Sequence, residues 1–185
     1  MYRKPRLWFW VLLMVGAVPA QSFAQQVTLT ANTTKSVYAH GEAVTVRLLL
    51  KNNGSAPVAV SPRWLGNVVI AAVTRNGAHV APRMAPIVFE EDLGVVLRAS
   101  LEPLAAGATA TIEQQSELDA GQGSQALKSV PYANSGRYVA SLFGIGLPGS
   151  YIASLTYHYT AGPGALTVAP FTGAINAKVS FKVSP

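Results

Sequence analysis

The segment from Leu147 to Tyr159 constrains the fold most strongly, because its side chains alternate in character. After the turn-forming pair Pro148-Gly149, apolar and aromatic residues occupy every second position and polar residues fall between them. The apolar set is Tyr151, Ala153, Leu155, Tyr157 and Tyr159, and the polar set is Ser154, Thr156 and His158. A period of two residues is typical of a β-strand with one buried face. The segment therefore predicts a strand in a sheet that is covered on one side.

Tyr151 stands at the start of this strand, two residues before Ala153. In antibody domains the second cysteine occupies the position of Ala153, and the preceding tyrosine forms a tyrosine corner, in which the phenol bonds to upstream backbone. Residues 136–141 (GRYVAS) resemble residues 149–154 (GSYIAS), so Tyr138 is the alternative corner. We favour Tyr151 because Leu147-Pro148 precede it and a longer alternation follows it.

The rest of the chain carries short alternating or apolar runs separated by turn residues. We expect strands near residues 27–31, 44–50, 57–61, 68–73, 95–101, 108–113 and 179–183, and a tight hairpin at Asn76-Gly77. Residues 113–146 are less regular, and residues 135–144 are interpreted as a short helix capped by Ser135 and ended by Gly144. The pattern predicts an all-β fold: an immunoglobulin-like antiparallel β-sandwich of eight to nine strands, with one irregular or short-helical insertion near residues 113–146.

The first 24 residues have the pattern of a secretory signal peptide. Arg3, Lys4 and Arg6 are followed by an apolar run over residues 7–15 and by small residues that end at Ala24. We expect cleavage after Ala24, with Ala20 as the second choice. The apolar run is shorter than the roughly 20 residues of a membrane span, so we expect no span after processing. Residues 25–185 then form a single sandwich domain in the bacterial periplasm or in the secreted fraction.

Composition excludes several classes of function. The chain has no cysteine, which excludes disulfides, thiolate metal sites and a cysteine nucleophile. Its formal charge of +6 falls when the signal peptide is removed, because 11 lysines and arginines then face 8 carboxylates and leave +3. These cations are scattered along the chain, so we expect no nucleic-acid partner.

The order of turn glycines and apolar positions resembles that of bacterial exported immunoglobulin-like modules. The residues that carry the resemblance are Tyr38-x-x-Gly41-Glu42-x-Val44-x-Val46-x-Leu48-x-Leu50-x-Asn52, Leu104-x-x-Gly107, Pro148-Gly149-x-Tyr151 and Val179-x-Phe181-x-Val183. The likeness is to macroglobulin-type and intracellular-proteinase-inhibitor-type domains, and it covers nearly all of residues 25–185. It implies a fold, and it implies an adhesion, assembly or inhibitory surface in place of an active site. The long connection over residues 113–146 departs from the compact version of such domains.

Few residues suggest a site. Glu90, Glu91 and Asp92 form an acidic run that is interpreted as a solvated loop, with a calcium site as the alternative; three adjacent acids lack the spacing of a calcium loop. His40, His79 and His158 are widely spaced, so we expect no metal and no cofactor.

Trp64 is the only tryptophan after residue 24. It is interpreted as the core tryptophan of a central strand, with an exposed anchor in a recognition loop as the alternative. In that alternative, an interaction surface would join Arg63, Trp64 and Arg83 to the acidic run Glu90-Glu91-Asp92, with Arg137 at its rim.

We therefore expect a non-catalytic protein that binds another protein or a cell-envelope component. Such partners bind at loops or add a strand to an open sheet edge. One alternative is a peptidase inhibitor that presents a loop such as residues 82–92. A second is a small carbohydrate-binding or hydrolytic module, although the sequence has no Gly-x-Ser-x-Gly motif and few acids.

Overall fold

The computed structural model describes residues 27–185, which contain fourteen strands and one helix. The predicted signal peptide lies outside the described residues. The elements are β1 (Val27–Thr33), β2 (Val37–Tyr38), β3 (Thr45–Asn52), β4 (Val58–Val60), β5 (Val68–Arg75), β6 (Ala78–His79), β7 (Arg83–Ile87), α1 (Leu93–Ala99), β8 (Glu102–Leu104), β9 (Thr109–Gln115), β10 (Glu117–Asp119), β11 (Ser124–Ser129), β12 (Tyr138–Gly144), β13 (Gly149–Tyr157) and β14 (Ile175–Val183).

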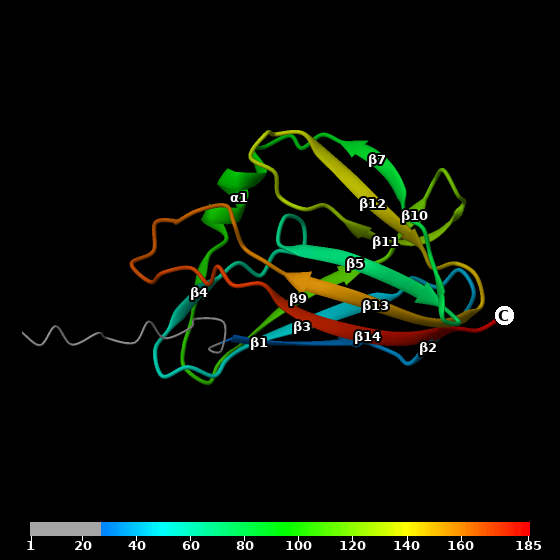
Figure 1. Ribbon diagram of the computed structural model, residues 1–185, viewed down its shortest axis with the longest axis horizontal. Coiled ribbons are helices and arrows are strands. Elements are labelled where there is room, and N and C mark those ends of the chain that lie inside the picture. Colours follow the sequence, from blue (N-terminus) through cyan, green and yellow to red (C-terminus); the bar gives the residue numbers. More distant parts are fainter. Residues whose placement is uncertain (1–26) are drawn as a thin grey trace, which may run out of the picture.

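Two sheets form an immunoglobulin-like sandwich (Figure 1). One sheet has the strand order β1-β3-β9, and the facing sheet has the order β2-β14-β13-β5-β6. In immunoglobulin terms these are strands A-B-E against G-F-C, with the tyrosine-corner strand F as β13. The short strand β2 runs parallel to β14, whereas the other pairings in both sheets are antiparallel. The predicted fold class is confirmed.

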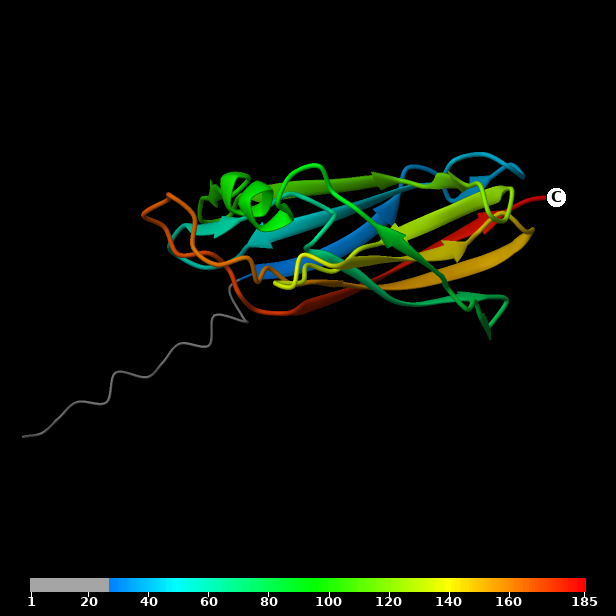
Figure 2. The same ribbon diagram turned by 90° about the horizontal axis from the view of Figure 1, so that it is seen from above.

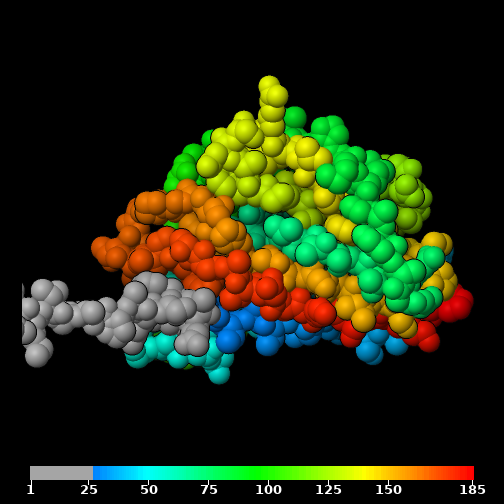
Figure 3. All heavy atoms as spheres, in the orientation of Figure 1, coloured from blue at the N-terminus to red at the C-terminus, as the bar shows by residue number. Residues whose placement is uncertain are grey.

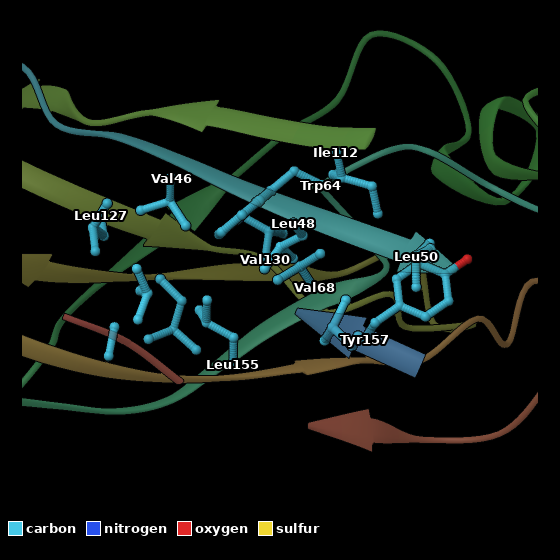
Figure 4. Packing of buried hydrophobic residues seen from close by; sticks show 14 of the residues in the cluster. Val46, Leu48, Leu50, Trp64, Val68, Ile112, Leu127, Val130, Leu155 and Tyr157 are labelled. Atoms are coloured by element: carbon cyan, nitrogen blue, oxygen red, sulfur yellow. The ribbon is translucent and has the colours of Figure 1, made fainter. Parts of the chain in front are cut away.

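The alternating residues of the strands fill the space between the two sheets. Val46, Leu48 and Leu50 of β3 are fully buried, and they face Leu155 and Tyr157 of β13 across the core (Figure 4). The intervening positions of β13 are exposed or half-buried. Alternation thus places one face of each strand in the core and the other in solvent, as expected from the period of two residues.

A third sheet, with the strand order β10-β11-β12-β7, covers the side of the sandwich where β9 and β5 lie (Figures 1 and 2). The predicted insertion supplies β10, β11 and β12 of this sheet. The helix interpretation of residues 135–144 is wrong, because residues 138–144 form strand β12. Tyr138, Ala140 and Leu142 point inward in β12 while Val139 is exposed, which is a strand period. In the space-filling view the yellow segment that contains β12 lies at the top of the molecule (Figure 3).

Two other local predictions are corrected. Residues 95–101 were expected to form a strand, but α1 occupies Leu93–Ala99. Residues 82–92 were expected to form a loop, but Arg83–Ile87 is strand β7, at the edge of the third sheet. An edge position accommodates Pro86, because one side of an edge strand needs no backbone donor.

The tight turn at residues 76–77 and most of the predicted strands lie where the sequence analysis expects them. Asn76 and Gly77 have φ values of 49° and 82°, as a two-residue type I′ hairpin requires, and they join β5 to β6. The strands expected near residues 27–31, 44–50, 57–61, 68–73, 108–113 and 179–183 are confirmed. The strand number exceeds the expected eight to nine, because several strands are only two or three residues long.

Candidate functional site

A groove of about 860 Å³ runs beside the C-terminal half of β9. We call it the β9 groove. Its walls come from β9, from α1 with the preceding residues 88–91, from residues 62–65 before β5, and from Lys128 of β11. The groove therefore lies where the third sheet and α1 meet the edge of the sandwich.

Strand β9 contributes an unpaired backbone edge to this groove. Its only neighbour in the sheet is β3. The Ser116 N–H donates to the Val44 carbonyl at 2.7 Å, and the Asn52 N–H donates to the Ala108 carbonyl at 3.0 Å. These bonds fix the register, so even-numbered residues of β9 bond to β3 and odd-numbered ones turn their N–H and C=O groups away from it. The outward-directed set is Thr109, Thr111, Glu113 and Gln115.

The other sheet edges of the described chain are protected. Strands β2 and β6 have two residues each, β10 has three, and β7 contains Pro86. Strand β1 is as long as β9, but it packs beside β14. Short strands and proline are devices that keep an edge from pairing with another chain. Strand β9 has seven residues, no proline and one charge, that of Glu113, so it carries none of these devices.

The inner wall of the groove is apolar. Trp64, Leu93 and Leu97 line it and are at most 5% exposed, and Val88 at its rim is 93% exposed. Trp64 packs among core residues and donates its indole N–H to the Lys128 carbonyl at 3.0 Å (Figure 4). The structure places Trp64 in the core, in the connection before β5 and not on a strand. Its outer side still forms part of the groove wall.

Four carboxylates and two cations surround the β9 groove, which gives a formal charge of −2 on a chain that is otherwise basic. Glu117 pairs with Lys128 at 3.1 Å, and Glu113 pairs with Arg47 of β3. Glu90 and Glu91 lie on an exposed segment without an ion pair in the described residues. Arg63, also exposed at the groove, has no ion pair in the described residues either, so the unpaired groups are two carboxylates and one cation. The groove is therefore negative toward solvent by one formal charge, which comes from residues 90–91.

Gln114 adds an unsatisfied acceptor to the groove wall. Its side-chain Oε1 is buried and has no hydrogen-bond partner within the described part of the chain. A buried acceptor without a partner is unfavourable by about 1–3 kcal/mol.

The groove unites only part of the surface expected from the sequence. It brings together Arg63, Trp64, Glu90 and Glu91. Asp92 instead caps α1, where its Oδ1 accepts a hydrogen bond from the Val95 N–H at 3.1 Å. Arg83 lies elsewhere and forms an ion pair with Asp119 in the third sheet. Arg137 is exposed in the turn before β12.

Tyr151 forms a corner that stabilises the start of β13. Its hydroxyl donates to the Leu147 carbonyl at 2.6 Å, and its ring stacks on Phe181 with a centroid separation of 5.2 Å. Burial raises the pKa of the Tyr151 hydroxyl, and Arg75 opposes that shift. The alternative residue, Tyr138, instead packs edge-on against Phe89 at 5.0 Å. Tyr151 therefore has the local upstream bond of a tyrosine corner.

The structure also bears on metals and membranes. Within residues 27–185, no group of three or more His, Cys, Asp or Glu side chains is placed to hold a metal ion. The run Glu90-Glu91-Asp92 is divided between the groove rim and the helix cap. No helix in this part of the chain is long and apolar enough to cross a membrane.

Sequence reasoning missed the free edge of β9 as a specific site. The strand itself was expected near residues 108–113. Binding at an open sheet edge was also expected, but no particular strand was named as that edge. The available signal was Thr109-Ala110-Thr111-Ile112, a β-branched run without proline or lysine, which is the composition of an unprotected edge. Its position at the edge depends on the strand order, which the sequence does not state.

Comparison with solved structures shows distant structural similarity. No protein-family model and no curated protein matches the chain. The solution NMR structure of a CARDB domain from Pyrococcus furiosus is similar to this chain, with a TM-score of 0.36 and 11% sequence identity. The similarity covers 86% of this chain and 94% of that domain.

Proposed function

We propose that this protein is a non-catalytic binding module that holds an extended, basic peptide segment of a partner along β9. The observation that carries the proposal is an unprotected seven-residue strand edge beside a groove of about 860 Å³. Backbone groups of an extended peptide bond to such an edge, and the neighbouring side-chain pockets provide specificity. At about 3.4 Å per residue, β9 offers an edge about 24 Å long.

Charge selects the kind of peptide. Glu90 and Glu91 are exposed at the groove and lack an ion pair, so lysines or arginines of the peptide have carboxylates to face. Val88 and the wall around Leu93 accept apolar side chains at the intervening positions. An extended segment that alternates basic and apolar residues therefore fits both surfaces.

The carboxylates support binding over hydrolysis. Glu113 and Glu117 are engaged by Arg47 and Lys128, and Glu90 and Glu91 are solvent-exposed. Hydrolysis by a carboxylate pair needs two carboxyl groups that are both free to act on one bond, and two of these four are held by cations. We therefore propose a protein that is not an enzyme.

The partner is proposed to be another protein or a cell-envelope component. This follows from residues 1–24, whose signal-peptide pattern predicts export to the bacterial periplasm or the medium. The resemblance to macroglobulin-type and inhibitor-type modules fits the same role. The peptidase-inhibitor alternative is weakened, because β7 occupies residues 83–87 and Asp92 caps α1, so only residues 88–91 of the expected loop are left. If purified protein slowed proteases, that alternative would be preferred.

The test uses a synthetic peptide of about ten residues in which lysine alternates with valine. Calorimetry should detect binding of this peptide and should not detect binding of a matched peptide with glutamate in place of lysine. Substitution of Thr111 by proline removes one outward N–H without breaking a bond to β3, and Thr111→Val is the matched control. We expect T111P to weaken binding about tenfold and T111V to leave it unchanged.

A second pair of variants tests the charge. The double variant Glu90→Gln with Glu91→Gln should weaken binding of the lysine peptide and reduce its salt dependence. Glu102→Gln, on exposed β8, is the control and should have no effect. Equal binding of the glutamate and lysine peptides, or indistinguishable T111P and T111V proteins, would refute the proposal.

A further inference from the structure

A second hollow is lined by the β5–β6 hairpin and by residues of the third sheet. It has a volume of about 420 Å³, and we call it the end pocket. The residues that matter to its chemistry are His40, Arg75, His79, Arg83, Asp119 and Leu147. They come from six separate segments of the chain, and none of the six lines the β9 groove.

The end pocket is positive toward solvent. Asp119 is the only carboxylate in its wall, and the Asp119 side chain is only 3% exposed. Both of its carboxylate oxygens are engaged: Arg83 Nε donates to Oδ2 at 2.9 Å, Arg83 Nη2 donates to Oδ1, and the Gly121 N–H also donates to Oδ1 at 2.9 Å. This carboxylate therefore has no free face toward a ligand, and the pair holds the Arg83 guanidinium in place.

Arg75 supplies a cation that no carboxylate neutralises within the described residues. Its backbone is fixed on both sides. It lies opposite Tyr151 in the pairing of β5 with β13, and next to it the Asn76 N–H donates to the Ser150 carbonyl at 2.7 Å. The half-buried Arg75 and the exposed His40 and His79 thus present positive or hydrogen-bond-donating groups to one hollow.

The remaining wall combines apolar side chains with the polar Gln122 and Ser124. Val80, Leu142 and Leu147 line it between the cations. Leu147 is held by the tyrosine corner, because its carbonyl accepts the Tyr151 hydroxyl at 2.6 Å. A hollow of this size with apolar walls and a few convergent polar groups is typical of a small-molecule site.

We propose that the end pocket binds a small organic carboxylate with an apolar body. The planar guanidinium of Arg75 matches a carboxylate through two parallel hydrogen bonds, and the apolar body packs against the leucines. The site is independent of the β9 groove, since the two share no residue among those that line them.

N-acetyl-leucine and its uncharged amide are matched probes that differ only in the carboxylate. Amide chemical shifts of isotopically labelled protein should move around residues 75–80 and 144–147 with N-acetyl-leucine and should not move with the amide. Arg75→Gln should weaken binding about tenfold. Lys178→Gln, which removes an exposed charge on β14, should leave binding unchanged.

His79→Gln is a second variant, on the exposed strand β6, in case Arg75→Gln disturbs the fold. It should also weaken binding, and K178Q should again serve as the control. Equal binding of acid and amide, shifts confined to another surface, or no shifts at up to about 10 mM probe would overturn the proposal.

Discussion

The hydroxyl of Tyr157 is expected to stabilise the fold through two buried hydrogen bonds. It donates to the Ser61 carbonyl at 3.2 Å, and the Ser61 N–H donates to it at 3.1 Å. Tyr157 and Ser61 are both fully buried. Burial raises the pKa of the Tyr157 hydroxyl far above its usual value, so the hydroxyl remains a donor at all ordinary pH values.

Substitution of Tyr157 by phenylalanine removes both bonds but affects the two Ser61 groups differently. The Ser61 carbonyl keeps a bond from Asn67 Nδ2 at 3.3 Å, whereas the Ser61 N–H loses its only partner. The lost bond is worth about 1 kcal/mol, and an orphaned buried N–H is unfavourable by about 1–3 kcal/mol. We expect the free energy of unfolding to fall by about 2–4 kcal/mol.

Tyr159→Phe is the matched control. The Tyr159 hydroxyl donates to the Gly162 carbonyl at 2.6 Å in a partly buried site, where water can replace the lost donor. Its expected loss is about 1 kcal/mol. The two variants are compared by urea unfolding, followed by circular dichroism, of the protein lacking residues 1–24. The comparison requires that the unfolding free energy falls with urea concentration at the same slope in both variants. A loss for Tyr157→Phe no larger than that for Tyr159→Phe would refute the reasoning.

Two further predictions concern backbone strain and acid stability. Gly66 has a φ of +90°, and an added Cβ would come within 2.6 Å of Leu97, so Gly66→Ala should lower the unfolding free energy by about 2–4 kcal/mol in urea titrations. Gly123→Ala, with a φ of +62° and open space, should lose only about 1 kcal/mol. The Arg83 guanidinium holds the pKa of the Asp119 carboxyl below its usual value. The ion pair therefore stabilises the fold fully above about pH 4, which is the pKa of an aspartate in the unfolded chain. This stabilisation is lost as the pH falls through the lowered pKa of the folded state. Asp119→Asn should flatten the acid limb of a plot of stability against pH, and an unchanged limb would contradict this.

The sequence predicts the sandwich well because a strand with one buried face has apolar residues at every second position. The buried Val46, Leu48 and Leu50 alternate with less buried residues in β3, and the same pattern of burial marks β13 and β14. These strands pair along their whole length, so local pattern and tertiary environment agree.

Prediction fails where short segments have two compatible patterns. Residues 93–99 contain Val95 and Val96, which favour a strand, but Leu93 and Leu97 are four residues apart and both buried, which is the spacing of a helix face. The helix start was marked by Asp92, a good N-cap residue that was assigned to an acidic loop. For so short an element, packing against the rest of the chain decides between the two patterns.

The candidate site was predictable only in part, because the sequence shows residue types but not the order of strands in a sheet. Residue type identified Arg63, Trp64, Glu90 and Glu91, which the fold brings to one groove. The free edge of β9 follows from strand order, and strand order is a property of long-range pairing that no local pattern encodes. Arg83 was assigned to the same surface because residues 82–92 were expected to form one loop. It instead begins strand β7 and lines the end pocket.

The third sheet explains why both concave sites exist. Its edge strands β7 and β10 are separated by two strands, and in a flat sheet with a spacing of about 4.8 Å they would lie about 14 Å apart. Arg83 of β7 nevertheless contacts Asp119 of β10 at 2.9 Å, so the sheet must curl strongly at this end. A curled sheet cannot lie flat against the sandwich. It leaves hollows where its ends meet β9 and the β5–β6 hairpin, and these hollows are the β9 groove and the end pocket.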